Sequence, residues 1–350
     1  MAQRGLTDDQ LQQVLDLVKQ HGTVAEAALE SGLNRSTFES RYRRALDKFG
    51  SDAEEQKNEA VLPTFPDEDI STPEIISHLK KRWEQKHEHE QAKKWFDIKI
   101  KTDDCYGLVV VGDPHLGTHT NWGLLERDVE IMSTTPGIGA LNIGDTVNNW
   151  SQRLIHLYAE EDISRKTERQ LAKWFLRDAE IPWICWTHGN HDTMHSEFST
   201  YLKAINVRQI PMVDWQAKFK LVFPSTTIKV DAAHNHKGTS IYNPLHGQKR
   251  ADLWGEDADI FVSGHHHTWA LQQHENTGGK VVTYARARGY KFHDEFAVTH
   301  QFNEEQFGSS IIFVIDPAAS ANNTRVKPFA DLKEGAEFLT WKRSRKKGKD

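Results

Sequence analysis

The feature that most constrains this chain is a series of short apolar segments, each ending beside glycine in aspartate, asparagine or histidine. In "FVSGHHHTWA", residues 261–270, three consecutive histidines follow such a segment. The five segment ends read GDPHLG (112–117), GDTVNNW (144–150), HGNHD (188–192), HNHKG (234–238) and GHHH (264–267). Open α/β sheets place their sites at the carboxyl ends of strands. We therefore expect five strands that deliver these polar side chains to one place.

Apolar runs from residue 105 onward predict strands. They cover 107–112, 139–144, 183–187, 218–223, 227–233, 259–264, 280–285 and 309–315. The early runs alternate with helical stretches at 122–132 and 163–178, whereas the later runs follow one another closely, as in a meander. This mixture predicts a layered α/β domain with helices on the outer faces of packed sheets.

Residues 6–50 have the periodicity of three short helices. Thr7 and Thr23 each stand three residues before a Gln or Glu, which is the spacing of a capping box. Asn34 can cap the third helix, and a tight glycine turn precedes it. The arrangement is typical of a helix-turn-helix unit.

Polar residues cover the side of the third helix opposite its apolar face. They are Arg35, Ser36, Thr37, Ser40, Arg41, Arg43 and Arg44. Such side chains suit phosphate contacts and the edges of bases in the major groove, so we predict a nucleic-acid partner, with DNA preferred. The alternative is a small helical docking unit whose basic face is only solvated.

Four regions follow from these patterns: a helix-turn-helix module (1–50), an acidic linker with a long charged helix (51–100), an α/β domain (101–320) and a C-terminal segment (321–350). The last of these ends in a basic tail that we expect to be disordered. No apolar run is long enough to span a membrane, and the N-terminus lacks the apolar core of a signal peptide. We therefore expect a cytoplasmic protein with no membrane partner.

The chemistry of the five segment ends favours metal binding. Carboxylate, imidazole and amide oxygen without thiolate suit Mn, Fe, Ni or Zn and disfavour a structural zinc knot. The 19 histidines of the chain support the same interpretation. In an extended chain, residues i and i+2 project to the same face. His265 and His267 can therefore serve adjacent ions while His266 points away.

These motifs, in this order, resemble the calcineurin-like metallophosphoesterase superfamily over residues 105–318. The resemblance implies a four-layer α-β-β-α sandwich, here with a small all-α helix-turn-helix domain at the N-terminus. The layout is also similar to phage-encoded members, which implies the cytoplasm of a bacterium or of a phage-infected host.

The resemblance also implies the roles of the polar residues. The first of two divalent ions would be held by Asp113, His115, Asp145 and His267. Asp145 would bridge to the second ion, which Asn190, His234 and His265 complete. His191 would protonate the leaving oxygen, with Asp145 as the other catalytic residue. Mn²⁺ is the expected metal, with Fe, Zn and Ni as alternatives.

One motif departs from the superfamily pattern Gly-Asp-x-x-Asp-Arg, because Asn148 and Asn149 replace its last two residues. Asn148 can still hydrogen-bond an imidazole but cannot offset its charge, and Asn148 and Asn149 are both candidates for substrate contact. Arg153 is a candidate for holding phosphate in place of the missing arginine. His236 is a further candidate for a substrate or supporting contact, although a surface histidine is as compatible with the pattern.

These features lead to the hypothesis of a metal-dependent phosphodiesterase that cleaves DNA with a hydroxide activated by two ions. No Ser or Cys nucleophile is needed. A second hypothesis is a phosphatase or cyclic-nucleotide phosphodiesterase acting on a small molecule or a phosphoprotein. A third is a DNA-binding adaptor with a scaffold phosphoesterase domain. The sequence leaves the oligomeric state open.

Overall fold

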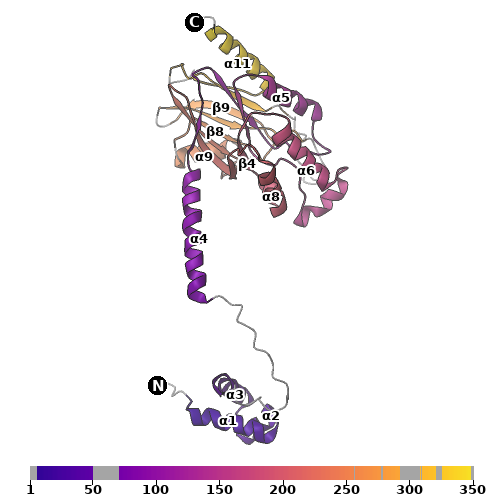
Figure 1. Cartoon of the computed structure of the whole chain (residues 1–350), viewed down its shortest axis with the longest axis vertical. Helices are drawn as coiled ribbons and strands as arrows, with labels where there is room; N and C mark the ends of the chain where they lie inside the picture. Colours follow the sequence, from indigo (N-terminus) through magenta and orange to yellow (C-terminus); the bar gives the residue numbers. More distant parts are fainter. Residues whose placement is uncertain are drawn as a thin grey trace. The chain divides into compact units, whose positions relative to one another are not determined.

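The computed structural model describes residues 6–49, 71–255, 257–276, 279–291, 308, 310–320 and 325–347. The chain divides into two compact units, Met1–Ile76 and Ser77–Asp350 (Figure 1). Most of the predicted acidic linker, residues 51–70, lies outside the described residues. Within the described ranges, each helix is too short or too polar to cross a membrane.

The first unit contains the three predicted helices, α1 (Asp8–His21), α2 (Val24–Glu30) and α3 (Arg35–Phe49) (Figure 1). Their buried side chains form two small clusters, one around Phe38 and one around Ala45. These clusters explain why the three helices pack together, since each alone buries only one apolar stripe.

The ends of these helices are capped largely as the sequence predicts. The side chain of Thr23 accepts from the Glu26 amide at 3.3 Å, and that of Asn34 accepts from the Ser36 amide at 3.1 Å. At Thr7 only the reverse half of the box forms, with the Thr7 amide donating to Gln10 Oε1 at 3.1 Å. The helical part of the N-terminal prediction is confirmed, while its role in binding DNA stays a prediction.

The charged helix predicted after the linker is also present, as α4 (Thr72–Lys93). Its apolar side chains, including Ile76 and Trp83, are exposed. The helix therefore contributes none of the buried residues that form the core clusters of the described chain.

The second unit is built on two mixed six-stranded sheets. The first has the order β1-β6-β7-β8-β10-β9, and the second has the order β12-β11-β2-β3-β4-β5. The strands of the first sheet are β1 (Phe96–Lys99), β6 (Gln216–Val222), β7 (Thr227–Ala233), β8 (Ile260–Ser263), β10 (Val281–Arg286) and β9 (Ala270–Glu275). Those of the second are β12 (Val326–Phe329), β11 (Ile311–Ile315), β2 (Tyr106–Val111), β3 (Ile138–Asn142), β4 (Trp183–His188) and β5 (Met212–Asp214).

All eight predicted strands are present, whereas β1, β5, β9 and β12 were not foreseen. These four are the edge strands of the two sheets. Edge strands are short or partly solvated, so they carry little of the continuous apolar run that marks the central strands.

Alternate residues of β2 show how the layers stack. Leu108 and Val110 face a cluster shared by both sheets, together with Phe219 and Val230. Val109 and Val111, which alternate with them along the strand, face the helices instead. The predicted mixed α/β layering is therefore confirmed as two packed sheets with helices outside them.

Helices cover the outer faces of the two sheets (Figure 1). The second sheet is covered by α5 (Trp122–Thr134), α6 (Arg165–Lys173), α8 (Ser196–Ile205) and α11 (Leu332–Lys347), and the first by α9 (His246–Trp254). The two helical stretches predicted at 122–132 and 163–178 correspond to α5 and to α6 with its following π turn η3 (Trp174–Asp178).

The expectation of a disordered basic tail at 341–350 is wrong for residues 341–347, which belong to α11 (Leu332–Lys347). Leu332, Ala336 and Leu339 make an apolar stripe that is buried on the second sheet. Strand β12 pairs with β11 just before this helix. The segment from 326 to 347 is thus part of the sandwich, and two of its basic side chains, Lys342 and Arg343, bond to Asp316 and to the Cys105 carbonyl.

Candidate metal centre

The five polar segment ends meet where the carboxyl ends of the central strands of both sheets lie together. Strands β2, β3 and β4 run parallel in one sheet, and β7 and β8 run parallel in the other. Backbone hydrogen bonds join the segments that follow these strands. The His115 amide donates to the Asp145 carbonyl at 3.0 Å, and the Gly264 amide donates to the His234 carbonyl at 3.1 Å.

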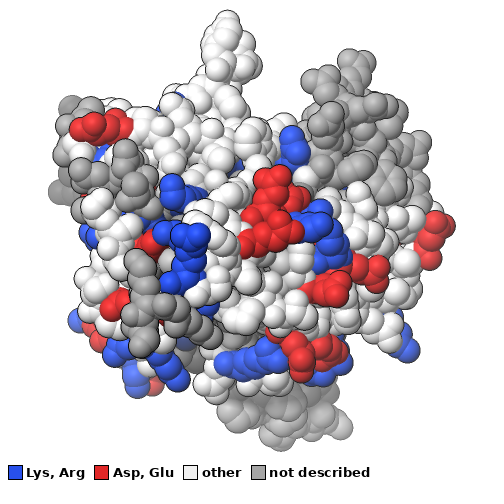
Figure 2. Space-filling view, turned by 90° about the horizontal axis from the view of Figure 1, so that it is seen from above, with Lys and Arg blue, Asp and Glu red and all other residues white. Residues whose placement is uncertain are grey.

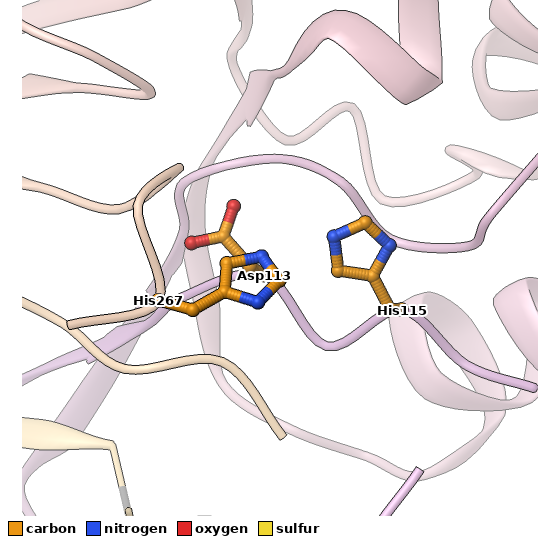
Figure 3. A group of neighbouring side chains, drawn as sticks. All are labelled: Asp113, His115 and His267. Atoms are coloured by element: carbon orange, nitrogen blue, oxygen red, sulfur yellow. The ribbon is translucent and has the colours of Figure 1, made fainter. Parts of the chain in front are cut away.

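Three groups of side chains place a ligand atom of every member within 4.8 Å of the others. The groups are Asp113 with His115 and His267, Asp145 with His234 and His265, and His115 with Asp145 and His191. Figure 3 shows the first group, in which Asp113 and His115 come from the segment after β2 and His267 from the segment after β8. His266 belongs to none of the groups found among the described residues.

The second group is the most crowded, and its centre is Nε2 of His234. Around this one nitrogen lie Asn190 Oδ1 at 2.9 Å, His265 Nδ1 at 3.0 Å and Asp145 Oδ2 at 3.3 Å. The other ring nitrogen, Nδ1, lies 2.9 Å from the carbonyl oxygen of Ile143. A carbonyl only accepts, so Nδ1 carries the hydrogen and Nε2 is directed to the cluster.

Asp145 is a member of the second group and also approaches the first. Its Oδ2 atom is 3.7 Å from His115 Nε2 and 3.3 Å from His234 Nε2. Its Oδ1 atom accepts from the backbone amide of His191 at 2.9 Å. One carboxylate thus contacts members of both groups, as a bridging ligand must.

The backbone at this cluster is strained. Asp113, His115, Asp145, His265 and His267 all have φ between 41° and 67°, in the left-handed region. Non-glycine residues seldom adopt this conformation, and its occurrences concentrate at functional sites. Five of the ten such residues in the described chain are members of this cluster.

Glycines beside the cluster leave room for the ligand side chains. A Cβ atom at Gly264 would lie 2.2 Å from Asp113 Oδ2, and one at Gly189 would lie 2.2 Å from Asp145 Oδ1. Any larger residue would collide with a carboxylate at either position. The sequence therefore needs glycine directly before His265 and directly before Asn190.

The donor set fits a divalent cation. The Oδ1 atom of Asp113 is buried and has no hydrogen-bond partner among the described residues. The His234 ring is the nearest group that can carry positive charge, with Nδ1 3.5 Å from this oxygen. A divalent cation could take the free position on the carboxylate. Burial raises the pKa of Asp113 to about 8, although His234 opposes the rise.

Burial and electrostatics divide the imidazoles into two kinds. Burial lowers the pKa of both His265 and His267 to about 4, so both rings are neutral and can offer a lone pair. Burial also opposes protonation of His234, but Asp145 and Asp113 outweigh it and raise the pKa of His234 to about 10.

His191 is held at the edge of the cluster by its neighbours in the loop after β3. Its Nδ1 donates to the backbone carbonyl of Asn148, and its own carbonyl accepts from Asn149 Nδ2 at 2.7 Å. The ring also packs edge-on against Trp150, with centroids 5.0 Å apart. The Asn148 carbonyl can only accept, so Nε2 is the nitrogen of His191 left to exchange a proton.

The structure changes the roles expected for Asn148 and Asn149. The Asn148 side chain is fully buried and bonds His115 Nδ1 at 3.0 Å, so it orients a metal-ligand candidate rather than His191. Asn149 is also buried and supports the His191 backbone. Both amides form hydrogen bonds within the protein.

Two other candidates for substrate contact fare differently. His236 is buried, with Nε2 3.1 Å from Asp231 Oδ1, because a buried imidazole needs a polar partner. It is therefore not a surface histidine, and its hydrogen bond to Asp231 is a contact within the protein. Arg153 falls in the short helix η2 (Gln152–Glu160), and its side chain lies outside the described part of the structure.

Sequence reasoning gave no role to Asp192, which ties two of the loops together. The buried carboxylate of Asp192 accepts from the backbone amides of Asp145 at 2.7 Å, Thr146 at 3.1 Å and Gly189 at 2.9 Å. It stands in the same HGNHD motif, so its sequence position already pointed to the site. An acidic residue beside Asn190 and His191 invites assignment as a ligand, whereas its contacts are with the backbone.

Sequence reasoning missed Lys291 entirely. Its Nζ atom lies 3.0 Å from Asn148 Oδ1, the atom that also contacts His115, and 4.7 Å from the centre of the Trp150 ring. Its charge is among the causes that lower the pKa of His115 and His267, after burial. Lys291 follows the strand β10 within "RARGYK", and no feature of that stretch separates it from other basic segments.

Comparisons with known proteins add a resemblance in fold. No protein-family model matches the chain, and no curated protein matches it. Wild-type Vps29 of Entamoeba histolytica, solved in complex with Zn²⁺, is 12% identical with a TM-score of 0.33, covering 64% of this chain and 97% of that one. Vps29 of Cryptosporidium parvum is 13% identical with a TM-score of 0.32, covering 65% and 100%. A hypothetical protein of Thermus thermophilus is 12% identical with a TM-score of 0.34, covering 64% and 98%.

The chain combines a mixed α/β fold of two six-stranded sheets with clusters of His and Asp that can bind a divalent metal.

Proposed function

We propose that this protein is a metal-dependent phosphodiesterase that hydrolyses phosphodiester bonds in DNA. The observation that carries the proposal is the convergence of all seven predicted ligands at one end of the two sheets. Asp145 lies within reach of both the Asp113 group and the His234 group. Asp113, His115, Asp145 and His267 would hold one ion, and Asp145, Asn190, His234 and His265 would hold the other.

The donor set supports Mn²⁺ as the working metal, because it offers imidazole and oxygen atoms without thiolate. Divalent ions at such a site stabilise the charge that develops on phosphate oxygens and lower the pKa of water. The protein's own contribution is to hold the ligands in strained backbone positions, so that their spacing is fixed before a substrate arrives.

His191 is the residue we assign to proton transfer. Its Nδ1 is engaged by the Asn148 carbonyl, so the orientation of the ring is fixed and Nε2 can protonate the leaving oxygen. The neighbouring cation Lys291 supports this step, since an ammonium group beside His115 can hold a non-bridging phosphate oxygen. Lys291 thereby supplies the positive charge that the motif at 144–149 lacks.

The choice of DNA as substrate is supported by the N-terminal unit. Ser36, Thr37, Arg43 and Arg44 are exposed on α3, Arg41 is half-buried, and Arg35 is exposed but pairs with Glu39 at 2.9 Å. Exposed arginines with neighbouring hydroxyls on a helix suit contacts with phosphate and base edges.

The distribution of charge on the second unit indicates that single cations, rather than one large basic surface, would attract DNA to the site. On the face seen in Figure 2, basic and acidic residues alternate, and neither sign forms one large patch. The chain as a whole has a net charge of -6. Contacts of single cations such as Lys291, together with the ions, would therefore hold the phosphate backbone at the site.

The test is cleavage of single- and double-stranded DNA by the full-length protein with Mn²⁺, beside bis(p-nitrophenyl) phosphate. We expect cleavage that stops on chelation and returns with added Mn²⁺. Asp145→Asn should lose both bound metal and activity. His191→Ala should keep its metal and lose roughly 10²- to 10⁴-fold in rate, the usual contribution of a general acid.

His266→Ala is the matched control, because His266 stands between two ligand candidates and belongs to no group itself. It should cleave DNA at the wild-type rate. Cleavage that survives chelation, or that survives both site substitutions, contradicts the mechanism. Salt-dependent DNA binding with no turnover under any divalent metal would instead support the adaptor hypothesis.

A further inference from the structure

Trp215 lies in an unusual position beside the candidate metal centre. It is the single residue between β5 of the second sheet and β6 of the first, so the chain crosses from one sheet to the other at this point. Its amide donates to the His188 carbonyl at 3.0 Å, and its carbonyl accepts from the His234 amide at 2.8 Å. The backbone of Trp215 is thus fixed between two strand ends that carry ligand candidates.

The crossing between the sheets explains the left-handed backbone of Trp215 but does not explain why a large aromatic side chain stands there. The residue has φ of 66°, a conformation that glycine adopts without strain and that is rare for a bulky residue. The indole is 48% exposed and belongs to none of the core clusters formed by the described residues. A large apolar ring is therefore kept in a strained, open position without a packing role.

The exposed ring also stands next to the cluster. The centroids of the Trp215 and His234 rings are 6.2 Å apart, at an interplanar angle of 64°. A flat aromatic ring beside a site for phosphate is the arrangement that proteins use to stack bases of single-stranded nucleic acid.

We propose that Trp215 is a stacking platform for the base next to the phosphate being cleaved. This inference rests on the proposed DNA phosphodiesterase activity and adds a substrate preference to it. In a duplex, each base is already stacked and paired, so its face is open to Trp215 only when the strand is unpaired. The enzyme therefore prefers single-stranded or locally unpaired DNA.

The test uses short single-stranded oligonucleotides that each carry one abasic residue, at successive positions. For the wild type, we expect the cut next to the abasic residue to weaken by about 10- to 100-fold, since stacking contributes such a factor per base. Trp215→Gly should cut all oligonucleotides about 10- to 100-fold more weakly and show no dependence on the abasic position. It should also lose the preference for single strands over duplex.

Glycine suits this test because it accepts the left-handed backbone, so the fold and the bound Mn²⁺ should be retained. Trp215→Phe keeps a ring and should keep the dependence on the abasic position. Trp341→Ala, on α11 and also 48% exposed in the wild type, should behave as the wild type does. If Trp215→Gly discriminates against abasic sites as the wild type does, the platform is overturned. If the wild type cleaves no DNA with Mn²⁺, the proposed function itself fails.

Discussion

At the scale of single residues, Lys291 offers the most direct test of how the site handles a phosphate. Its ammonium group contacts the same Asn148 oxygen that contacts His115, so it lies beside the first group of ligands. We predict that Lys291→Met lowers kcat/KM for DNA by roughly 10- to 100-fold, in line with the loss of one charge-assisted contact to a developing charge. Steady-state cleavage assays with Mn²⁺ would measure this.

Lys291→Arg should recover part of the activity, because it restores a cation at the same place. Lys280→Met is a suitable control, since Lys280 precedes the opposite end of β10 and pairs with Asp257 and Asp259. Metal content should be unchanged in all three variants. Wild-type kcat/KM in Lys291→Met would show that the ammonium group does not meet the phosphate.

The ligand candidates could be predicted because metal ligands are few in type and stood at strand ends beside glycine. His234 and Asp145 meet, although they follow strands of different sheets. The supporting residues could not be predicted in the same way. Asn148 was expected to hydrogen-bond an imidazole, and that ring is His115. Which of two nearby rings an amide reaches depends on side-chain angles that sequence does not specify.

At the scale of elements, Glu168 on α6 fixes the loop that carries Asp145 to the helical layer. Its carboxylate accepts from the Asn149 amide at 3.1 Å, and burial raises its pKa from 4.5 to about 7. The folded state therefore holds this proton more tightly than the unfolded state. Its contribution makes the protein less stable as the pH rises from about 4.5 to 7, and the cost is complete above that window.

We predict that Glu168→Gln, which keeps an acceptor for Asn149, is more stable than the wild type at pH 8 by at most about 3 kcal/mol. The difference should vanish below about pH 4.5, where the wild-type carboxyl is neutral in both states. Thermal unfolding of both proteins across this pH range would measure it. A constant difference at every pH would mean that Glu168 does not titrate as its burial implies.

The central strands could be predicted because burial on both faces leaves a continuous apolar run, as in "YGLVVV" of β2. Strand β9 escaped prediction because it is an edge strand with the sequence ALQQHE, in which only Ala270 is buried. The end of α11, residues 341–347, was taken for a tail because its basic residues drew attention from the buried stripe of Leu332 and Leu339 earlier in the same helix. The prediction of a tail gave more weight to the basic composition of this segment than to the helical spacing of its apolar residues.

At the scale of the whole molecule, the division into two compact units suggests that hydrolysis and DNA binding reside in different parts of the chain. A chain shortened to residues 71–350 keeps every ligand candidate and both sheets. We predict that it binds Mn²⁺ and hydrolyses bis(p-nitrophenyl) phosphate as the full chain does, while its affinity for DNA falls and depends less steeply on salt. Equal DNA affinity and equal salt dependence in both chains would assign no DNA contacts to α1, α2 and α3.

The contacts of Asp192 have a mechanical consequence. One carboxylate grips the peptide groups of Asp145 and Thr146 on one loop and of Gly189 on the next. Asp145 and His191 are thereby held on two loops that a single side chain ties together. Thermal motion should therefore change the gap between the Asp145 carboxylate and the His191 ring less than it would for two independent loops.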